Sequence, residues 1–217
     1  MAVTINGSTG IASVDASVSA PSVRGTDGNT GISYGADSIK FSTGGVERLA
    51  ISNSGVSGVG KILQVLSDTK TDQSSTSSQT WADLPGLSIA ITPASTSNKI
   101  LVSWFITAGN GGGEWALRLR RDSTDIAQGT ISDNPTVLTK VTDAFYGGSD
   151  TGEGNYGLAS RNGHWLDSPS STSAITYGFQ WSNMSSSGTV YINRGSYDSG
   201  IYGPRGVSSI TVTEVAG

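Results

Sequence analysis

The sequence predicts an all-β protein with a β-rich stalk over residues 1–60 and a β-sandwich, jelly-roll-like head domain over residues 61–217. Ser, Thr and Gly make up roughly two residues in five, a bias that favours short strands joined by turns over helices. Apolar residues recur with a period of two, as at Ile100, Val102 and Ile106, which is the pattern of a strand with one buried face. Cysteine is absent, so no disulfide holds the fold.

The first region is predicted to consist of short strands that cannot form a core alone. VTINGSTGI alternates apolar and polar residues around Asn6-Gly7, a dipeptide typical of a tight hairpin, and Pro21 indicates an edge or a break. From Asp27 to Gly55 the apolar residues stand singly or in pairs among residues that favour turns. One chain of such strands would bury too little apolar surface to offset the entropy of ordering, whereas several chains wound around one axis would bury enough. We therefore expect an intertwined homo-oligomeric stalk that ends near Gly60.

The second region is expected to contain about eight short strands, the number and spacing typical of a sandwich or jelly roll. KILQVL, from Lys61, has the β-branched and apolar mixture of a strand, and Pro93 ends a strand through Leu87–Ile91. Further strands are predicted at Ile100–Ile106, Trp115–Arg120, Asp122–Gly129, Val137–Tyr146, Ala174–Trp181, Thr189–Arg194 and Ser208–Val215. Long loops are expected over Tyr146–Ser173 and Gly195–Gly206.

Composition argues against several classes of function. Only 14% of residues are charged and the net charge is −4, so we expect no binding to nucleic acid. No apolar run approaches ~20 residues, so no membrane insertion is expected. The N-terminal sequence MAVTINGSTGIASVD lacks the basic and apolar regions of a signal peptide. These features fit an assembly that forms in a cytoplasm and is later released from the cell.

Two stretches resemble proteins of tailed bacteriophages. DGNTGI, followed by ADSIKFSTGGVERLAISNSG, is similar to a module that recurs in tail fibres and related structural proteins. The matching residues are Asp27, Asn29, Thr30, Gly31, Ile32, Ala36, Asp37, Ile39, Phe41, Gly44, Gly45, Glu47, Arg48, Ile51 and Gly55. From Lys61, the segments KILQVLSDTKTD, WADLPGLSIAITPASTSNKILV, LRLRRDSTDIAQG, GTVYINR and SSITVTEVAG resemble the C-terminal domain of many tail-fibre-like proteins. The sequence departs from that pattern mainly between Tyr146 and Ser173.

The resemblance implies a virion protein, namely a phage tail fibre that works as a homotrimer. Its N-terminal region would attach to phage tail or baseplate proteins, and its head domain would bind a host surface glycan. Such a protein is assembled in the host cytoplasm and uses no cofactor or metal. Two alternatives stay open: a purely structural virion protein with a trimerising β-sandwich, and a glycan-degrading tailspike.

Aromatic and polar residues in the two expected loops are candidates for receptor binding. Aromatic faces stack on the C–H faces of sugars, while carboxylates, amides and Arg donors bond to hydroxyl groups. The competing interpretation is packing between subunits, because interfaces also favour Tyr, Trp and Arg. The candidates are Tyr146, Tyr156, Arg161, His164, Trp165, Asp167, Tyr197, Asp198 and Tyr202.

Catalysis has little support in the sequence. His164 is the only histidine, and its neighbours, RNGHWLDSP, lack the G-x-S-x-G turn of a serine nucleophile. A carboxylate pair for glycan cleavage would have to come from acids in the expected loops, such as Glu153 and Asp167. We therefore expect a binding protein and not an enzyme.

Three smaller groups of residues each allow two interpretations. The first group would bind an anionic sugar; its members are Arg118, Arg120 and Arg121. Alternatively, these arginines would form a solvated strand face, or ion pairs between subunits with Asp122 or Asp125. A second group would bind Ca²⁺ or would form Asx turns; its members are Asp27, Asn29 and Asp37. The third group would lie in the core or in subunit contacts, which we expect, or would form platforms for a ligand; its members are Trp81, Trp104, Trp115 and Trp181.

Overall fold

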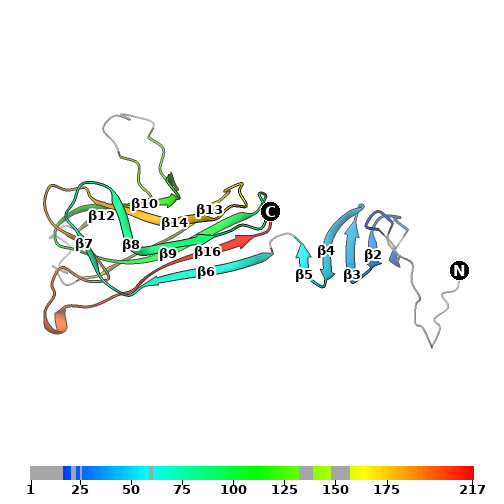
Figure 1. Ribbon diagram of the computed structural model, residues 1–217, viewed down its shortest axis with the longest axis horizontal. Helices are drawn as coiled ribbons and strands as arrows, with labels where there is room; N and C mark the ends of the chain where they lie inside the picture. Colours follow the sequence, from blue (N-terminus) through cyan, green and yellow to red (C-terminus); the bar gives the residue numbers. More distant parts are fainter. Residues whose placement is uncertain (1–16, 21–22, 25, 59–60, 132–138, 148–156) are drawn as a thin grey trace. The chain divides into compact units, whose positions relative to one another are not determined.

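The computed structural model describes residues 17–20, 23–24, 26–58, 61–131, 139–147 and 157–217. These residues form an all-β structure in which no helix is long and apolar enough to cross a membrane. The chain divides into two units, Met1–Lys61 with Ala216–Gly217, and Ile62–Val215 (Figure 1). This division lies beside the boundary predicted near Gly60.

The N-terminal unit contains one antiparallel sheet whose strands follow one another in chain order. The strands are β1 (Val23–Arg24), β2 (Gly31–Gly35), β3 (Ser38–Thr43), β4 (Val46–Ser52) and β5 (Gly55–Gly58). Gly44 and Gly45 join β3 to β4 with φ angles of 58° and 75°, a left-handed turn that suits the twist of a hairpin and favours glycine.

Local hairpins supply the hydrogen-bond partners of these strands, since each pairs with a neighbour from the same chain. The winding of several chains around one axis stays a prediction. The hairpin predicted at Asn6-Gly7 lies outside the described residues.

The C-terminal unit consists of two antiparallel sheets packed face to face, the arrangement of a β-sandwich (Figure 1). The first sheet has the order β6-β16-β9-β15-β7, with β13 on the other side of β9. Its strands are β6 (Ile62–Lys70), β7 (Ser74–Thr76), β9 (Lys99–Asn110), β13 (Ala159–Asp167), β15 (Val190–Ile192) and β16 (Ser208–Val215).

The second sheet has the order β11-β10-β14-β8, with β12 also paired to β10. Its strands are β8 (Ala82–Ile91), β10 (Gly113–Arg121), β11 (Thr124–Ile126), β12 (Asp143–Gly147) and β14 (Ile175–Asn183). A short 3-10 helix, η3 (Gly200–Tyr202), lies in the connection between β15 and β16.

The two ends of the sandwich are distinguished by the β6–β16 pairing. At one end Ile62 pairs with Val215, and at the other Lys70 pairs with Ser208. We call the Ile62 end basal and the Lys70 end apical. The β15–β16 connection therefore lies at the apical end.

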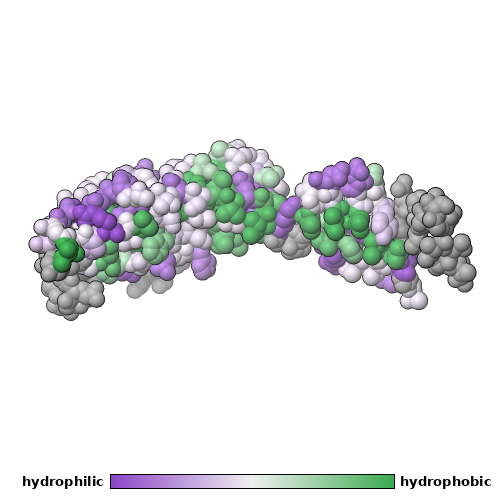
Figure 2. Space-filling model, turned by 90° about the horizontal axis from the view of Figure 1, so that it is seen from below, coloured by the Kyte–Doolittle hydropathy of each residue, from purple (hydrophilic) through white to green (hydrophobic). Residues whose placement is uncertain are grey.

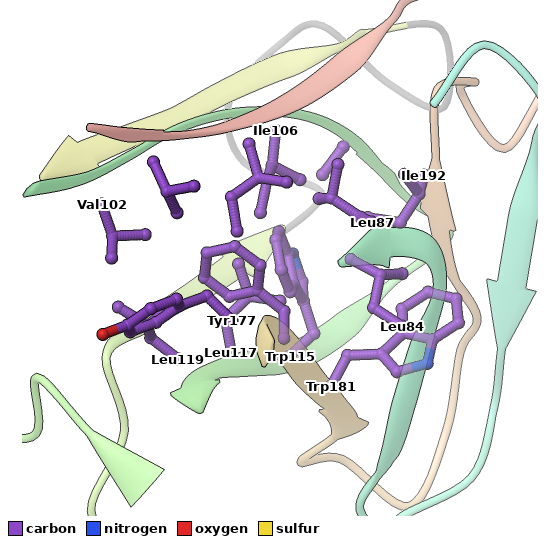
Figure 3. Packing of buried hydrophobic residues seen from close by; sticks show 14 of the residues in the cluster. Leu84, Leu87, Val102, Ile106, Trp115, Leu117, Leu119, Tyr177, Trp181 and Ile192 are labelled. Carbon is purple, nitrogen blue, oxygen red and sulfur yellow. The ribbon is translucent and has the colours of Figure 1, made fainter. Parts of the chain in front are cut away.

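Alternating side chains from both sheets fill the space between them (Figure 3). β9 contributes Ile100, Val102 and Ile106, and β10 contributes Trp115 and Leu117, all of them buried. Complete burial of one such side chain stabilises the fold by ~1.5–3 kcal/mol. The period-two pattern of the sequence thus predicted these strands because their inward residues form the core.

The tryptophans follow the core interpretation in most cases. Trp115 and Trp181 belong to the core, and Trp104 packs against it with its ring edge-on to Phe179, 5.6 Å between centroids. Trp81 is half-buried and lies outside this core, where the Arg118 guanidinium stacks 3.8 Å from its ring.

The prediction of one long loop over Tyr146–Ser173 is wrong, because β13 lies within it. β13 pairs with β9 along its whole length but is an edge strand with mostly exposed side chains. Backbone hydrogen bonds hold it in place, so it needs no apolar alternation. The predicted strand Asp122–Gly129 is also shorter, since Asp122 and Ala127 adopt positive φ at the two ends of β11.

Candidate functional site

Two cross-strand rows of apolar and aromatic side chains lie on one face of the N-terminal sheet. Paired residues share a face, and positions two apart in a strand share it as well. The first row is Val23, Ile32, Phe41 and Leu49; the second is Tyr34, Ile39, Ile51 and Val56. We call these eight residues the assembly face.

The assembly face is open to solvent in the single chain. Tyr34, Ile51 and Val56 expose 45%, 43% and 50% of their surface, and Figure 2 shows apolar atoms gathered over this part of the chain. The described residues of the unit supply no second layer, although a sheet normally buries its apolar face against another element.

The opposite face of the same sheet carries mainly polar and small side chains. Its central row joins Ser33, Lys40, Ala50 and Ser57. Lys40 also forms an ion pair with Glu47 at 3.1 Å. This difference between the faces indicates that only the assembly face is built for contact with another apolar layer.

Asp167, one of the receptor-binding candidates, is committed to contacts inside the sandwich. It is buried at the end of β13, where its carboxylate accepts hydrogen bonds from Arg121 Nη1 at 2.9 Å and from the Tyr177 hydroxyl at 2.7 Å. Burial, together with this hydrogen bond, raises the pKa of the Tyr177 hydroxyl well above its usual range. Asp167 therefore joins the two sheets and is not available to a ligand.

Asp198 forms ion pairs within the apical connection between β15 and β16. One carboxylate oxygen pairs with Arg194 at 2.6 Å, and the other pairs with Arg205. Arg194 also stacks over the Tyr191 ring at 4.5 Å. These contacts fix both ends of the connection, which we call the apical loop (residues 194–205).

The apical loop presents apolar surface at its tip. Ile201 in η3 exposes 91% of its surface, and Tyr197 exposes 39%. Tyr202 lies in the same 3-10 helix. Ile201 was not among the sequence candidates because a lone isoleucine between glycine and tyrosine has no pattern that marks exposure.

The candidates on β13 point in opposite directions. His164 pairs with Ser103 and faces outward, whereas Trp165 pairs with the inward residue Val102 and stays 42% exposed only because β13 is an edge strand. Arg161 stacks on the Phe145 ring at 4.1 Å.

A shallow depression of about 780 Å³ lies along β9 and β13. Its lining includes Ser103, Asn162 and His164. These polar groups lie on the outer face of the sheet, away from the core.

The candidates that the structure describes therefore do not lie together in one site. Those on β13 lie along the sheet, and Tyr197, Asp198 and Tyr202 belong to the apical loop. Tyr146 lies in β12, where its backbone pairs with Glu114, and Tyr156 lies outside the described residues.

The arginine cluster forms ion pairs within the chain. Arg118 and Arg120 approach Asp125 at 3.5 and 3.1 Å, and Arg121 binds Asp167. These contacts favour the interpretation as an ion-paired strand face, with partners in the same chain.

The candidate calcium ligands make turn contacts. Asp27 accepts hydrogen bonds from the Thr30 hydroxyl at 2.6 Å and from the Asn29 amide at 3.1 Å, as in an Asx turn. These bonds lower the pKa of Asp27. Across the residues that the structure covers, no group of three acidic or histidine side chains is placed to hold a metal.

One buried acid was not among the residues predicted from the sequence. Glu214 is fully buried, and its carboxylate accepts hydrogen bonds from Gln64, Asn98 and the Ala94 amide at 2.6, 2.5 and 2.7 Å. Burial raises the pKa of Glu214, but the three hydrogen bonds outweigh it and lower the pKa overall. The sequence does mark this residue, because it continues the inward alternation of Ile210 and Val212.

Comparisons with known proteins do not assign the chain to a class. No protein-family model matches it, and no curated protein matches it.

Proposed function

We propose that the protein is a tail-fibre-like attachment protein of a tailed phage and acts as a homotrimer. The observation that carries this proposal is the assembly face, eight apolar and aromatic residues on one side of a single-layer sheet. The same stretch, Asp27–Gly55, is the one that resembles tail-fibre modules. In the proposal, three such sheets cover one another's apolar faces, and the N-terminal region attaches to tail or baseplate proteins of the virion.

The jelly-roll-like head then presents its apical end to the host surface, where it binds a glycan. The apical loop supports this role because ion pairs restrain it, which reduces the entropy cost of binding. Exposed Ile201 and Tyr197 offer surfaces that pack on the C–H faces of a sugar. Three heads per fibre would convert weak single-site binding into firm attachment through effective concentration.

A purely structural virion protein is the second candidate. It is favoured by the internal contacts of Asp167 and Asp198, whose carboxylates would otherwise have been the strongest hydroxyl-binding groups of the predicted site. The same contacts do not favour a glycan-degrading tailspike, since neither acid is free for chemistry.

Binding of labelled full-length protein to an array of bacterial lipopolysaccharides and capsular polysaccharides tests the proposal. We expect binding to at least one polysaccharide, reduced tenfold or more by Tyr197→Ala with Ile201→Ser. Ser88→Ala, at an exposed position of β8, is the control and should bind normally. Loss of binding on His164→Ala instead would place the site in the depression along β9 and β13 and contradict the apical loop. Assembly without binding to any polysaccharide would favour the purely structural role, and release of new reducing ends would favour the tailspike.

A further inference from the structure

The outer face of the β6-β16-β9-β13 sheet carries a group of apolar side chains at its basal end. One cross-strand row runs Val65, Thr213, Leu101 and Leu166, and the adjacent basal pair is Ile62 with Val215. These residues face outward because their neighbours in β9 and β16, such as Ile100 and Val212, are buried in the core. We call the five apolar members the basal patch: Ile62, Val65, Leu101, Leu166 and Val215.

The next row toward the apical end is polar. It runs Ser67, Thr211, Ser103 and His164, and Ser67 and Thr211 hydrogen-bond at 2.9 Å. The basal patch differs sharply, since Ile62, Val65 and Leu166 expose 59%, 55% and 55% of their surface. This cluster of aliphatic residues, exposed on β6 and β13 and partly exposed on β9 and β16, marks an interaction surface.

β6 adds a second observation, because it is a long edge strand with little protection. Among the described strands only β16 pairs with it, and its first six residues, ILQVLS, carry no charge. Natural edge strands are normally protected by charges, proline or a covering element. Figure 2 shows apolar surface at the basal part of the sandwich.

Chain connectivity identifies what covers this surface. β5 ends at Gly58 and β6 begins at Ile62, so the linking chain spans at most ~14 Å. If copies meet through their assembly faces, the Ile62 ends of their sandwiches must also lie near one another. Apolar residues at that end suit such proximity, because the neighbouring copies would cover them.

We propose that the basal patch is a second interface between copies of this chain, an inference that rests on the homo-oligomer of the proposed function. The patch runs from β6 at one edge of the sheet to β13 at the other. In a closed three-fold arrangement, the Val65 side of one copy therefore meets the Leu166 side of the next. The heads are thereby held together at their base while their apical loops stay open.

Disulfide trapping in the full-length protein tests this arrangement, because the chain has no cysteine of its own. Under mild oxidation, Val65→Cys with Leu166→Cys should give covalent dimers and trimers on a non-reducing gel. Each single variant should stay monomeric on the gel. The control pair Ser123→Cys with Leu166→Cys should also give none, because Ser123 lies in the turn before β11, in the other sheet.

The mass in solution tests the assembly of the chain, and the cross-links test the basal interface separately. A trimeric mass in solution without cross-links would overturn the basal interface and leave the assembly face standing. Dimers from the Val65→Cys or Leu166→Cys single variant would overturn the three-fold contact in favour of two-fold pairing. A monomeric mass at micromolar concentration would overturn both proposals.

Discussion

Ile51 of β4 pairs directly with Val56 of β5, and both side chains point to the open side of the N-terminal sheet. The next pair, Ala50 with Ser57, points to the opposite side. Adjacent residues in each strand therefore lie on opposite faces. A substitution on the assembly face can be compared with the same substitution on the polar face.

Ile51→Asp should dissociate the oligomer. The substitution places a carboxylate in the proposed apolar contact, and an unpaired buried charge costs about 3–5 kcal/mol. Sedimentation velocity should show a shift to slower species. Ser57→Asp puts the same charge on the polar face and should sediment like the wild type; equal dissociation by both variants would contradict the assignment of the faces.

Glu214→Gln should destabilise the protein in a pH-dependent way. The pKa of Glu214 is lower in the folded state than its ordinary value of 4.5, so its contribution is present above about pH 4.5 and is lost as the pH falls through the folded-state pKa. We expect a loss of about 2 kcal/mol at pH 7, because the amide cannot accept from all three donors, and a smaller loss at pH 3.

Urea unfolding at the two pH values measures this difference. Exposed Glu114, changed to Gln, is the control and should have little effect at either pH. A loss for Glu214→Gln that does not change with pH would contradict the role of the charged carboxylate.

Gly163→Ala should destabilise the sandwich through a steric clash. A Cβ atom at this position would lie 2.4 Å from Cζ2 of Trp104, whose ring packs on Phe179. Overpacking of this kind costs about 1–3 kcal/mol in thermal or urea unfolding. Gly129→Ala meets no atom within 4 Å and should be neutral; equal stability of the two variants would show that Trp104 can move aside.

Asp198→Asn should loosen the apical loop without unfolding the sandwich. The carboxylate holds Arg194 and Arg205, but all three side chains are partly exposed, so the change in global stability should stay below about 1 kcal/mol. Hydrogen–deuterium exchange should rise at residues 195–206. Asp83→Asn, a far more exposed carboxylate that also contacts an arginine, should leave this exchange unchanged.

The sequence predicted the elements whose side chains enter the core. Ile100, Val102 and Ile106 alternate because each faces the opposite sheet, and this periodicity is local to the strand. β13 has no such signature, since an edge strand is fixed by backbone bonds to β9. The pairing of Asp167 with Arg121, 46 positions away, depends on the fold and cannot be read from either neighbourhood.

In the N-terminal sheet, the strand register shows which apolar residues lie on the same face, and the composition does not. Ile39 and Ile51 stand apart among polar residues in the sequence, yet β3 and β4 place them side by side. The sequence predicted that this stretch could not bury itself, and the register identifies the face that stays open.

The central claim is that copies of the chain cover one another's assembly faces, and the mass of the full-length protein in solution tests it most directly. Multi-angle light scattering at micromolar concentration should give about three times 22.2 kDa. A stable monomer of 22.2 kDa that remains folded would contradict the claim.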